Sequence, residues 1–178
     1  MFMSLIRKRR SIRKFLDKPV EKEKLDLLVE AGMRGPSSRG INPWHFVVVS
    51  DRKMLGRLSQ AREHGSAFLK NASVGIVVCA DASKSDVWVE DASIAAVMIH
   101  LAAESLDLGS CWIQIRERMH DAQKTAEMYV GEVLGLPRQL KVESMLGIGY
   151  PDEKKAPHPK ESLPYTQVHA ESYGNSYR

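Results

Sequence analysis

Four short runs of the chain are almost entirely apolar, and they constrain the fold more than any other feature. They read WHFVVV, VGIVVCA, SCWIQI and VESMLGIGYP, at residues 44–49, 74–80, 110–115 and 142–151. A strand with one face in water alternates apolar and polar residues, whereas a strand covered on both faces is apolar throughout. The runs therefore predict one domain over residues 1–178, with a sheet between two helical layers in a three-layer α+β fold.

Helical patterns lie between these runs. Leu25, Leu28 and Val29 share one face at the i, i+3, i+4 spacing of an amphipathic helix. A later stretch is rich in alanine, which permits close packing, and Glu90 and Asp91 at its start favour a helix beginning there. The predicted helices span residues 5–10, 21–33, 87–106 and 121–134, together with a stretch through Leu58 that Ser50 or Asp51 can cap.

The composition changes after Pro151. Residues 152–178 contain three prolines and many polar residues, and they show no helical face. A segment of this kind cannot form a core of its own. Two interpretations remain open: the tail wraps around a partner, or it is disordered.

A basic segment, RKRRSIRKF at residues 7–15, is the strongest charge feature. Six of its nine residues are cationic. Arginine offers a planar fork of donors that suits phosphate, and Ser11 adds a hydroxyl. Because residues two apart on an extended chain point the same way, Ser11 and Arg13 are predicted to face one ligand. A targeting signal, a nucleic-acid arm or a solvated basic face would have the same composition.

The net charge of +4 and the pI of about 9.1 suggest an anionic ligand without requiring nucleic acid. Base-stacking aromatic residues are missing near the basic segment, which argues against a nucleic-acid interface. The loop from Pro36 to Pro43 offers serine hydroxyls and the Asn42 amide, although an ordinary helix-to-strand connection would look the same.

Other sequence signals point to a protein of the cytoplasm. Cys79 and Cys111 lie in apolar runs and are predicted to be free thiols of the core. No run approaches the ~20 apolar residues of a membrane span, and no apolar stretch follows the basic N-terminus as in a secretory signal. The six histidines lack the spacing of metal ligands, so no metal site is expected. No GxGxxG fingerprint for dinucleotides is present.

Several of these motifs, in this order, resemble the FMN-dependent nitroreductase family. The similarity spans nearly the whole chain. It rests on RRSIRKF at 9–15, PSS at 36–38, NPWHF at 42–46, KNA at 70–72, the stretch VEDASIAAVMIHLAAESLDLGSCWI at 89–113 and MLGIGYP at 145–151.

The resemblance implies a nitroreductase-like fold with a mainly antiparallel sheet, and a homodimer with an FMN site at the interface. In such a dimer the tail, residues 152–178, crosses to the other subunit. The resemblance implies that Arg9, Arg10, Ser11 and Lys160 hold the phosphate and ribityl chain, and that Arg13 lies near flavin N1 and O2. It further implies that Pro36, Ser37 and Ser38 come from the other subunit and lie against the ring, and that Gln114, Ile115 and Arg116 pass flavin N5 and O4. Asn42, in the same loop, is a further predicted cofactor-binding residue.

The chain departs from the family pattern at three places. Gly40 and Asn42 stand where the loop often carries Asn and Gln. Ser162 stands where an arginine often follows the tail lysine, which lowers the expected affinity for phosphate. A second cation near the flavin pyrimidine has no clear counterpart, and Lys70 and His64 are the candidates.

The expected activity is reduction of nitroaromatics, quinones or enones by NAD(P)H, in a ping-pong cycle through flavin N5, with Arg13 favouring the reduced flavin. Two alternatives remain open. One is a low-turnover flavin-binding or redox-sensing protein, and the other is a family member that carries out dehalogenation or oxidation.

Overall fold

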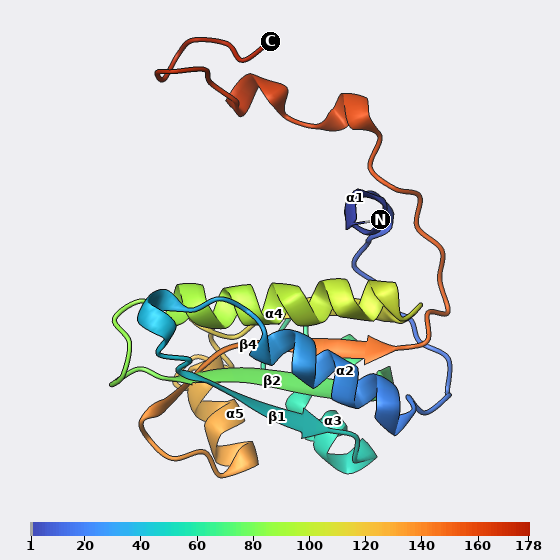
Figure 1. Ribbon diagram of the computed structural model, residues 1–178. Helices are drawn as coiled ribbons and strands as arrows, with labels where there is room; N and C mark the ends of the chain where they lie inside the picture. Colours follow the sequence, from blue (N-terminus) through green and yellow to red (C-terminus); the bar gives the residue numbers. More distant parts are fainter. Residues whose placement is uncertain (1) are drawn as a thin grey trace.

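The computed structural model describes residues 2–178 and has a central antiparallel sheet (Figure 1). The strands lie across the sheet in the order β1 (Trp44–Val49), β2 (Val74–Asp81), β4 (Leu140–Gly149) and β3 (Gly109–Gln114), and all three neighbouring pairs are antiparallel. Every residue of the central strand β2 is buried. The predicted strands are confirmed, with shifts of at most two residues at their ends.

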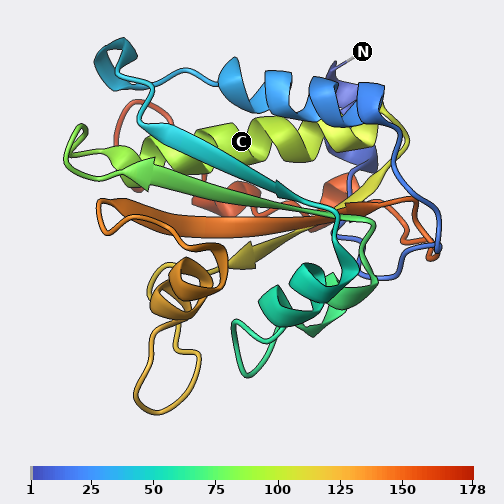
Figure 2. The ribbon, with the colours of Figure 1, turned by 90° about the horizontal axis from the view of Figure 1, so that it is seen from below.

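Two long helices cover one face of the sheet (Figure 2). They are α2 (Lys22–Met33) and α4 (Trp88–Ser105). Leu28 of α2 and Ile99 of α4 pack with Ile76, Val78 and Leu146 of the sheet, and all five side chains are fully buried. The alanine-rich face of α4 brings this helix close to both α2 and the sheet, as its small side chains predict.

Shorter helices cover the opposite face. They are α3 (Arg52–Leu58) and α5 (Ala126–Leu134). Leu55 and Val130 pack there against Val77, Cys79 and Met145, which alternate along the strands with the residues that face α4. The three-layer α+β arrangement predicted from the apolar runs is confirmed.

Two predicted helices have different bounds. α1 covers Phe2–Lys8 and does not extend through Arg10, because Ser11 and Ile12 already pair with β3. The predicted helix at 121–134 begins only at Ala126. Its first residues form a turn in which the Asp121 carboxylate accepts hydrogen bonds from the backbone N–H groups of Gln123 and Lys124, each at 2.8 Å.

The tail leaves the domain beside the start of the chain. Figure 1 shows it passing α1 and ending well away from the sheet. Its first residues still contact the domain, and two short 3-10 turns follow at Lys160–Ser162 and Tyr165–Gln167. The described chain thus consists of a three-layer arrangement followed by an extended C-terminal segment.

Candidate functional site

The basic segment lies along the outer edge of strand β3. Its backbone forms a parallel bridge from Ser11 to Ser110, and the N–H of Ile12 donates to the carbonyl oxygen of Ser110 at 3.0 Å. A side chain at Gly109 would place its Cβ 2.7 Å from a methyl carbon of Ile12, so this close approach requires glycine. The sheet therefore fixes the backbone of the cationic residues.

Arg9 turns toward the long helix α4. Its guanidinium Nη1 lies 2.8 Å from Nε2 of His100, a buried histidine of α4. The other ring nitrogen of His100 is hydrogen-bonded to the Ser110 hydroxyl of β3. Burial, and then the Arg9 charge, lower the pKa of His100 to about 4, so the ring is neutral at pH 7.

Burial raises the pKa of the Cys111 thiol, and the charge of Arg13 and the hydroxyl of Ser11 oppose this rise in part. That Ser11 and Arg13 face one ligand stays a prediction. The Arg13 guanidinium carbon also lies 6.0 Å from the centre of the Phe68 ring. Cys79 is likewise buried, and burial raises its pKa to about 12, so both cysteines are the free core thiols expected.

The start of the tail completes this region. The Glu153 carboxylate accepts the backbone N–H groups of Arg13 at 2.5 Å and Lys14 at 3.1 Å. Lys155 donates from Nζ to the Ser11 carbonyl oxygen at 2.6 Å, and Arg10 donates to the carbonyl oxygen of Ala156. Lys155 is thus a lysine at the basic segment that the sequence interpretation missed.

Lys160, the predicted tail ligand, is exposed in the extended part of the tail. Its role stays a prediction. Between the basic segment and the tail lies a cavity of about 520 Å³, next to the start of β3. Its charged lining consists of Lys8, Arg10, Lys154 and Lys155 with Glu104, Asp107 and Glu153. We regard the basic segment, including Arg9 and Ser11 beside this cavity, together with the basic side of the cavity as the candidate anion site.

The predicted loop residues gather at the other end of α4. The backbone N–H of Ser38 donates at 2.8 Å to Asp91, a buried carboxylate in the first turn of α4. Ser37 donates its hydroxyl to Oδ1 of Asn42 at 2.7 Å and accepts the Asn42 N–H at 2.9 Å. Asn42 adopts φ 51°, a left-handed conformation that asparagine tolerates well. Asp91 therefore holds this loop in place, in addition to favouring the start of α4 as the sequence predicts.

The end of β3 is held by a buried polar cluster. Gln114 accepts Nε1–H of Trp112 at 3.0 Å and donates to the Arg116 carbonyl oxygen at 3.1 Å and to Oε1 of Glu143 at 3.5 Å. Glu143 is 4 % exposed, its Oε2 has no partner within the described residues, and burial raises its pKa. The Glu143 carbonyl oxygen also accepts the N–H groups of Ile115 and Arg116. This cluster fixes residues 114–116.

A cation that the sequence interpretation did not name reaches the same strand end. Arg62 donates from Nη1 to the Gln114 carbonyl oxygen at 3.2 Å, and burial followed by the Arg118 charge lowers its pKa. The side chains of Lys70 and His64, the candidates for a second cation, are exposed. Arg62 lies between two helices, in a segment without a periodic pattern. The direction of its side chain could therefore not be predicted from the sequence.

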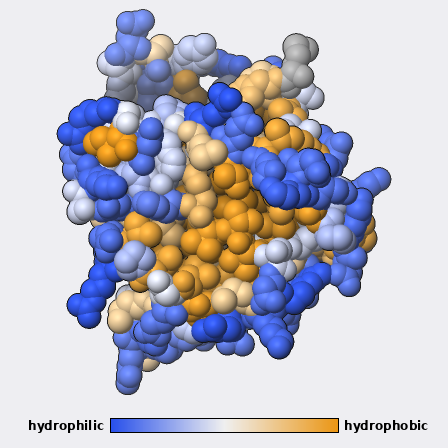
Figure 3. Space-filling model, turned by 60° about the horizontal axis from the view of Figure 1, so that its bottom comes forward, coloured by the Kyte–Doolittle hydropathy of each residue, from blue (hydrophilic) through white to orange (hydrophobic). Residues whose placement is uncertain are grey.

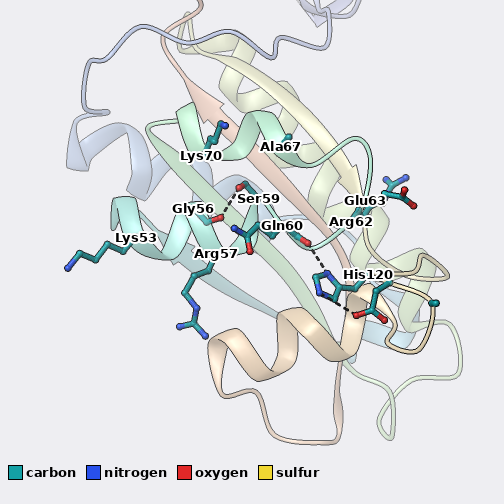
Figure 4. A pocket seen from close by; sticks show the side chains of 12 residues that line it. Lys53, Gly56, Arg57, Ser59, Gln60, Arg62, Glu63, Ala67, Lys70 and His120 are labelled. Atoms are coloured by element: carbon teal, nitrogen blue, oxygen red, sulfur yellow. Dashed lines mark hydrogen bonds and ion pairs between the residues drawn. The ribbon is translucent and has the colours of Figure 1, made fainter.

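Arg62 also borders a cavity of about 1020 Å³ between α3 and the loop that contains His120. Figure 4 shows Lys53 and Arg57 extending away from it, whereas His120 faces Gln60, whose carbonyl oxygen lies 2.8 Å from Nδ1. Its cations do not converge on one point. This cavity is therefore a weaker candidate for an anion than the region beside Arg10.

Within residues 2–178, no helix is both long and apolar enough to cross a membrane. The same part of the chain holds no group of three His, Cys, Asp or Glu side chains placed to bind a metal ion.

These features define a class: a three-layer α+β domain with a basic segment fixed on a sheet edge. The model of the nitroreductase family matches residues 6–64 and 51–150. The chain belongs to the nitroreductase family.

Known relatives agree with this assignment. An FMN-dependent nitroreductase from Clostridium difficile is 48% identical, with a TM-score of 0.95 over 96% of this chain and 99% of that one. An FMN reductase [NAD(P)H] from Bacillus subtilis is 30% identical over 93% of this chain and 72% of its own length. The NADPH:FMN oxidoreductase from Vibrio harveyi, solved with NAD+, is 27% identical with a TM-score of 0.79, over 97% and 77% of the two chains.

Proposed function

We propose that this protein is an FMN-dependent NAD(P)H oxidoreductase that reduces electron-poor acceptors such as nitroaromatics, quinones or enones. The observation that carries the proposal is the basic segment, which β3, α4 and the tail fix in place within a nitroreductase-family fold. Bound FMN supplies hydride transfer from NAD(P)H to the acceptor, through N5 in a ping-pong cycle.

The donor groups of this chain fit the phosphate of FMN. Arg9 and Arg10 supply guanidinium donors, and Ser11 supplies a hydroxyl on the same short segment. Lys155 lies beside them and adds an ammonium group, which also pairs with the Glu153 carboxylate at 3.3 Å. A terminal phosphate carries two negative charges, so this set favours FMN over FAD, whose phosphates are internal.

The remaining predicted residues would contact the ring. Arg13 is exposed beside Phe68, where its charge can favour the reduced flavin at N1 and O2. Residues 114–116 would pass N5 and O4 as a rigid edge of the site, because the buried cluster around Glu143 holds them in place. Arg62 joins Lys70 and His64 as a candidate for the second cation, and its hydrogen bond to Gln114 favours it.

A homodimer would complete the site. Ser38 is held at Asp91 and Arg9 at His100, nine residues apart on α4, which corresponds to about 14 Å of helix rise. The loop with Pro36, Ser37, Ser38 and Asn42 can therefore serve the flavin of a partner subunit. We infer that the tail, including Lys160, crosses to that partner.

Exposed apolar surface supports association. The exposed apolar side chains include three on α1 and two on α4: Phe2, Met3, Ile6, Ile94 and Val97. Figure 3 shows a further gathering of apolar side chains across the middle of the face seen there. Surfaces of this kind mark protein interfaces, and a permanent dimer buries about 2,000 Å² or more. The free thiols Cys79 and Cys111 suit a dimer that works in the reducing cytoplasm.

The purified protein tests the proposal directly. We expect absorbance bands at about 370 and 450 nm from bound oxidised flavin, and bleaching of these bands when NADH or NADPH is added without oxygen. Reoxidation by a nitroaromatic or a quinone should restore them. A yellow protein that NADH and NADPH reduce only slowly would support a flavin-binding or redox-sensing role, and a colourless protein that cannot be loaded with FMN would refute the proposal.

Arg13→Gln should lower the midpoint potential of bound FMN by tens of millivolts. Glutamine keeps hydrogen-bond donors but removes a positive charge, and reduced flavin is more negative than oxidised flavin. For a two-electron couple, about 30 mV corresponds to 1.4 kcal/mol. The measurement is a spectroelectrochemical titration of both proteins, with the affinity for oxidised FMN as control. An unchanged potential with weaker FMN binding would instead make Arg13 a phosphate ligand.

A further inference from the structure

We propose that His100 is a positioning residue for the flavin phosphate: it holds the Arg9 guanidinium in the orientation that binds the anion. The inference rests on the proposed function. It concerns a residue that touches neither cofactor nor substrate and acts only through Arg9.

The hydrogen bonds fix the protonation state of the His100 ring. A guanidinium can only donate, so Nε2 of His100 must accept the hydrogen bond from Arg9 at 2.8 Å. The neutral ring carries its single proton on the other nitrogen, Nδ1, which therefore donates to the Ser110 hydroxyl. His100 is only 8 % exposed, and water cannot readily replace either partner.

The same contacts join three elements around the basic segment. His100 belongs to α4, Ser110 to β3, and Arg9 follows α1. Ser110 also accepts the Ile12 N–H on its carbonyl oxygen, so one residue of β3 supports both the backbone of the basic segment and the ring that holds Arg9. Nearby, Lys8 lies 3.4 Å from Glu104 of α4 and 3.6 Å from Asp107, as an exposed ion pair.

This arrangement leaves Arg9 available to an anion. One of its five N–H groups is used by His100, and the others remain for a phosphate. A long arginine side chain loses rotamer freedom when it binds a ligand, and a side chain held in advance loses less. A neutral acceptor achieves this without competing for the charge, whereas a carboxylate in the place of His100 would neutralise it.

A double-mutant cycle on FMN affinity tests the inference. Arg9→Ala should weaken FMN binding about tenfold or more, because it removes charge-assisted bonds to phosphate. His100→Leu should weaken it about threefold to tenfold, the cost of ordering one free side chain. In the Arg9→Ala background, His100→Leu should have almost no further effect, because the residue through which it acts is gone.

A matched pair of amides sharpens the test. Glutamine places its carbonyl oxygen near the position of Nε2 and can accept from Arg9, so His100→Gln should restore most of the affinity. Asparagine reaches only to the position of Nδ1, so His100→Asn should behave like His100→Leu. Each dissociation constant is measured by quenching of FMN fluorescence. Thermal melts of the same proteins identify variants that fail to fold, and the glutamine–asparagine comparison carries the test if the leucine variant is one of them.

The outcomes separate this inference from the proposed function. If the wild-type protein binds no FMN, both are refuted. If Arg9→Ala weakens FMN but His100→Leu and His100→Asn do not, only the role of His100 is refuted. Equal losses from His100→Leu with and without Arg9 would also refute it, because His100 would then act independently of that arginine.

Discussion

Removing residues 157–178 is expected to convert the proposed dimer into a folded monomer. Every hydrogen bond of this segment in the described chain joins two of its own residues, so the rest of the described chain loses no hydrogen bond. Four of its large apolar side chains are exposed, with Tyr173 at 93 %, and we infer that a partner subunit covers them. Light scattering should give the mass of two 20.0 kDa chains for the full protein and about one chain for the shortened protein.

A second truncation after Pro151 separates the two functions of the tail. It also removes Glu153 and Lys155, which bond to the basic segment within one chain. We expect this protein to lose FMN more completely than the one that ends at Ala156. A full-length protein that scatters as one chain while flavin is bound would overturn the dimer. A shortened protein that remains a tight dimer would show that the tail is not part of the interface.

The sheet was predictable from the sequence because burial on both faces leaves a direct mark on composition. Runs such as 74–80 contain no polar residue, and the structure buries all of them. The order of the strands was not predictable in this way. β4 lies between β2 and β3 although it comes last in the chain, and no period within a strand indicates its neighbour. Only the resemblance to the family indicated an antiparallel sheet.

The start of α5 shows how a local preference can be misread. Residues 121–125 continue a helical pattern, but Asp121 bonds to the backbone of the next residues, and Thr125 caps the helix by accepting the Met128 N–H at 3.1 Å. Short polar side chains compete with the helix for backbone donors, which favours a turn here. The cap at Thr125 was available as a signal, since threonine is a preferred cap residue.

The supporting residues of the site were not predictable, because they are distant in sequence from the groups they hold. His100 is 91 residues from Arg9, and Lys155 is 144 residues from Ser11. His100 lies in an alanine-rich helix and belongs to no recognisable motif. Lys155 is one of several lysines in a charged tail, and nothing in the sequence distinguishes it from the others. The family pattern directed attention to Lys160, whereas the structure brings Lys155 to the basic segment.

When the pH falls from 6.5 to about 4, the free energy of unfolding should decrease less in His100→Gln than in the wild-type protein, by up to about 3 kcal/mol. The folded protein lowers the pKa of His100 from 6.5 to about 4, so the unfolded chain binds a proton over this range while the folded one does not. The stability from a neutral His100 is complete above pH 6.5 and is lost progressively as the pH falls to about 4. At about 1.4 kcal/mol per pH unit, the whole interval corresponds to about 3 kcal/mol. The glutamine side chain does not titrate in this pH range, and its carbonyl oxygen can still accept the hydrogen bond from Arg9.

The measurement is urea-induced unfolding, followed by circular dichroism from pH 6.5 down to pH 4, with both proteins at the same protein and FMN concentrations. Glu143 acts in the opposite sense, because its raised pKa lets the folded protein bind a proton first as the pH falls, and its effect is common to both proteins. The difference between their curves therefore isolates position 100. If the free energies of unfolding of the two proteins changed with pH in parallel over this range, the pKa of His100 would not be lowered in the folded protein. That result would contradict the assignment of a neutral His100 ring that accepts from Arg9 at mild acidity.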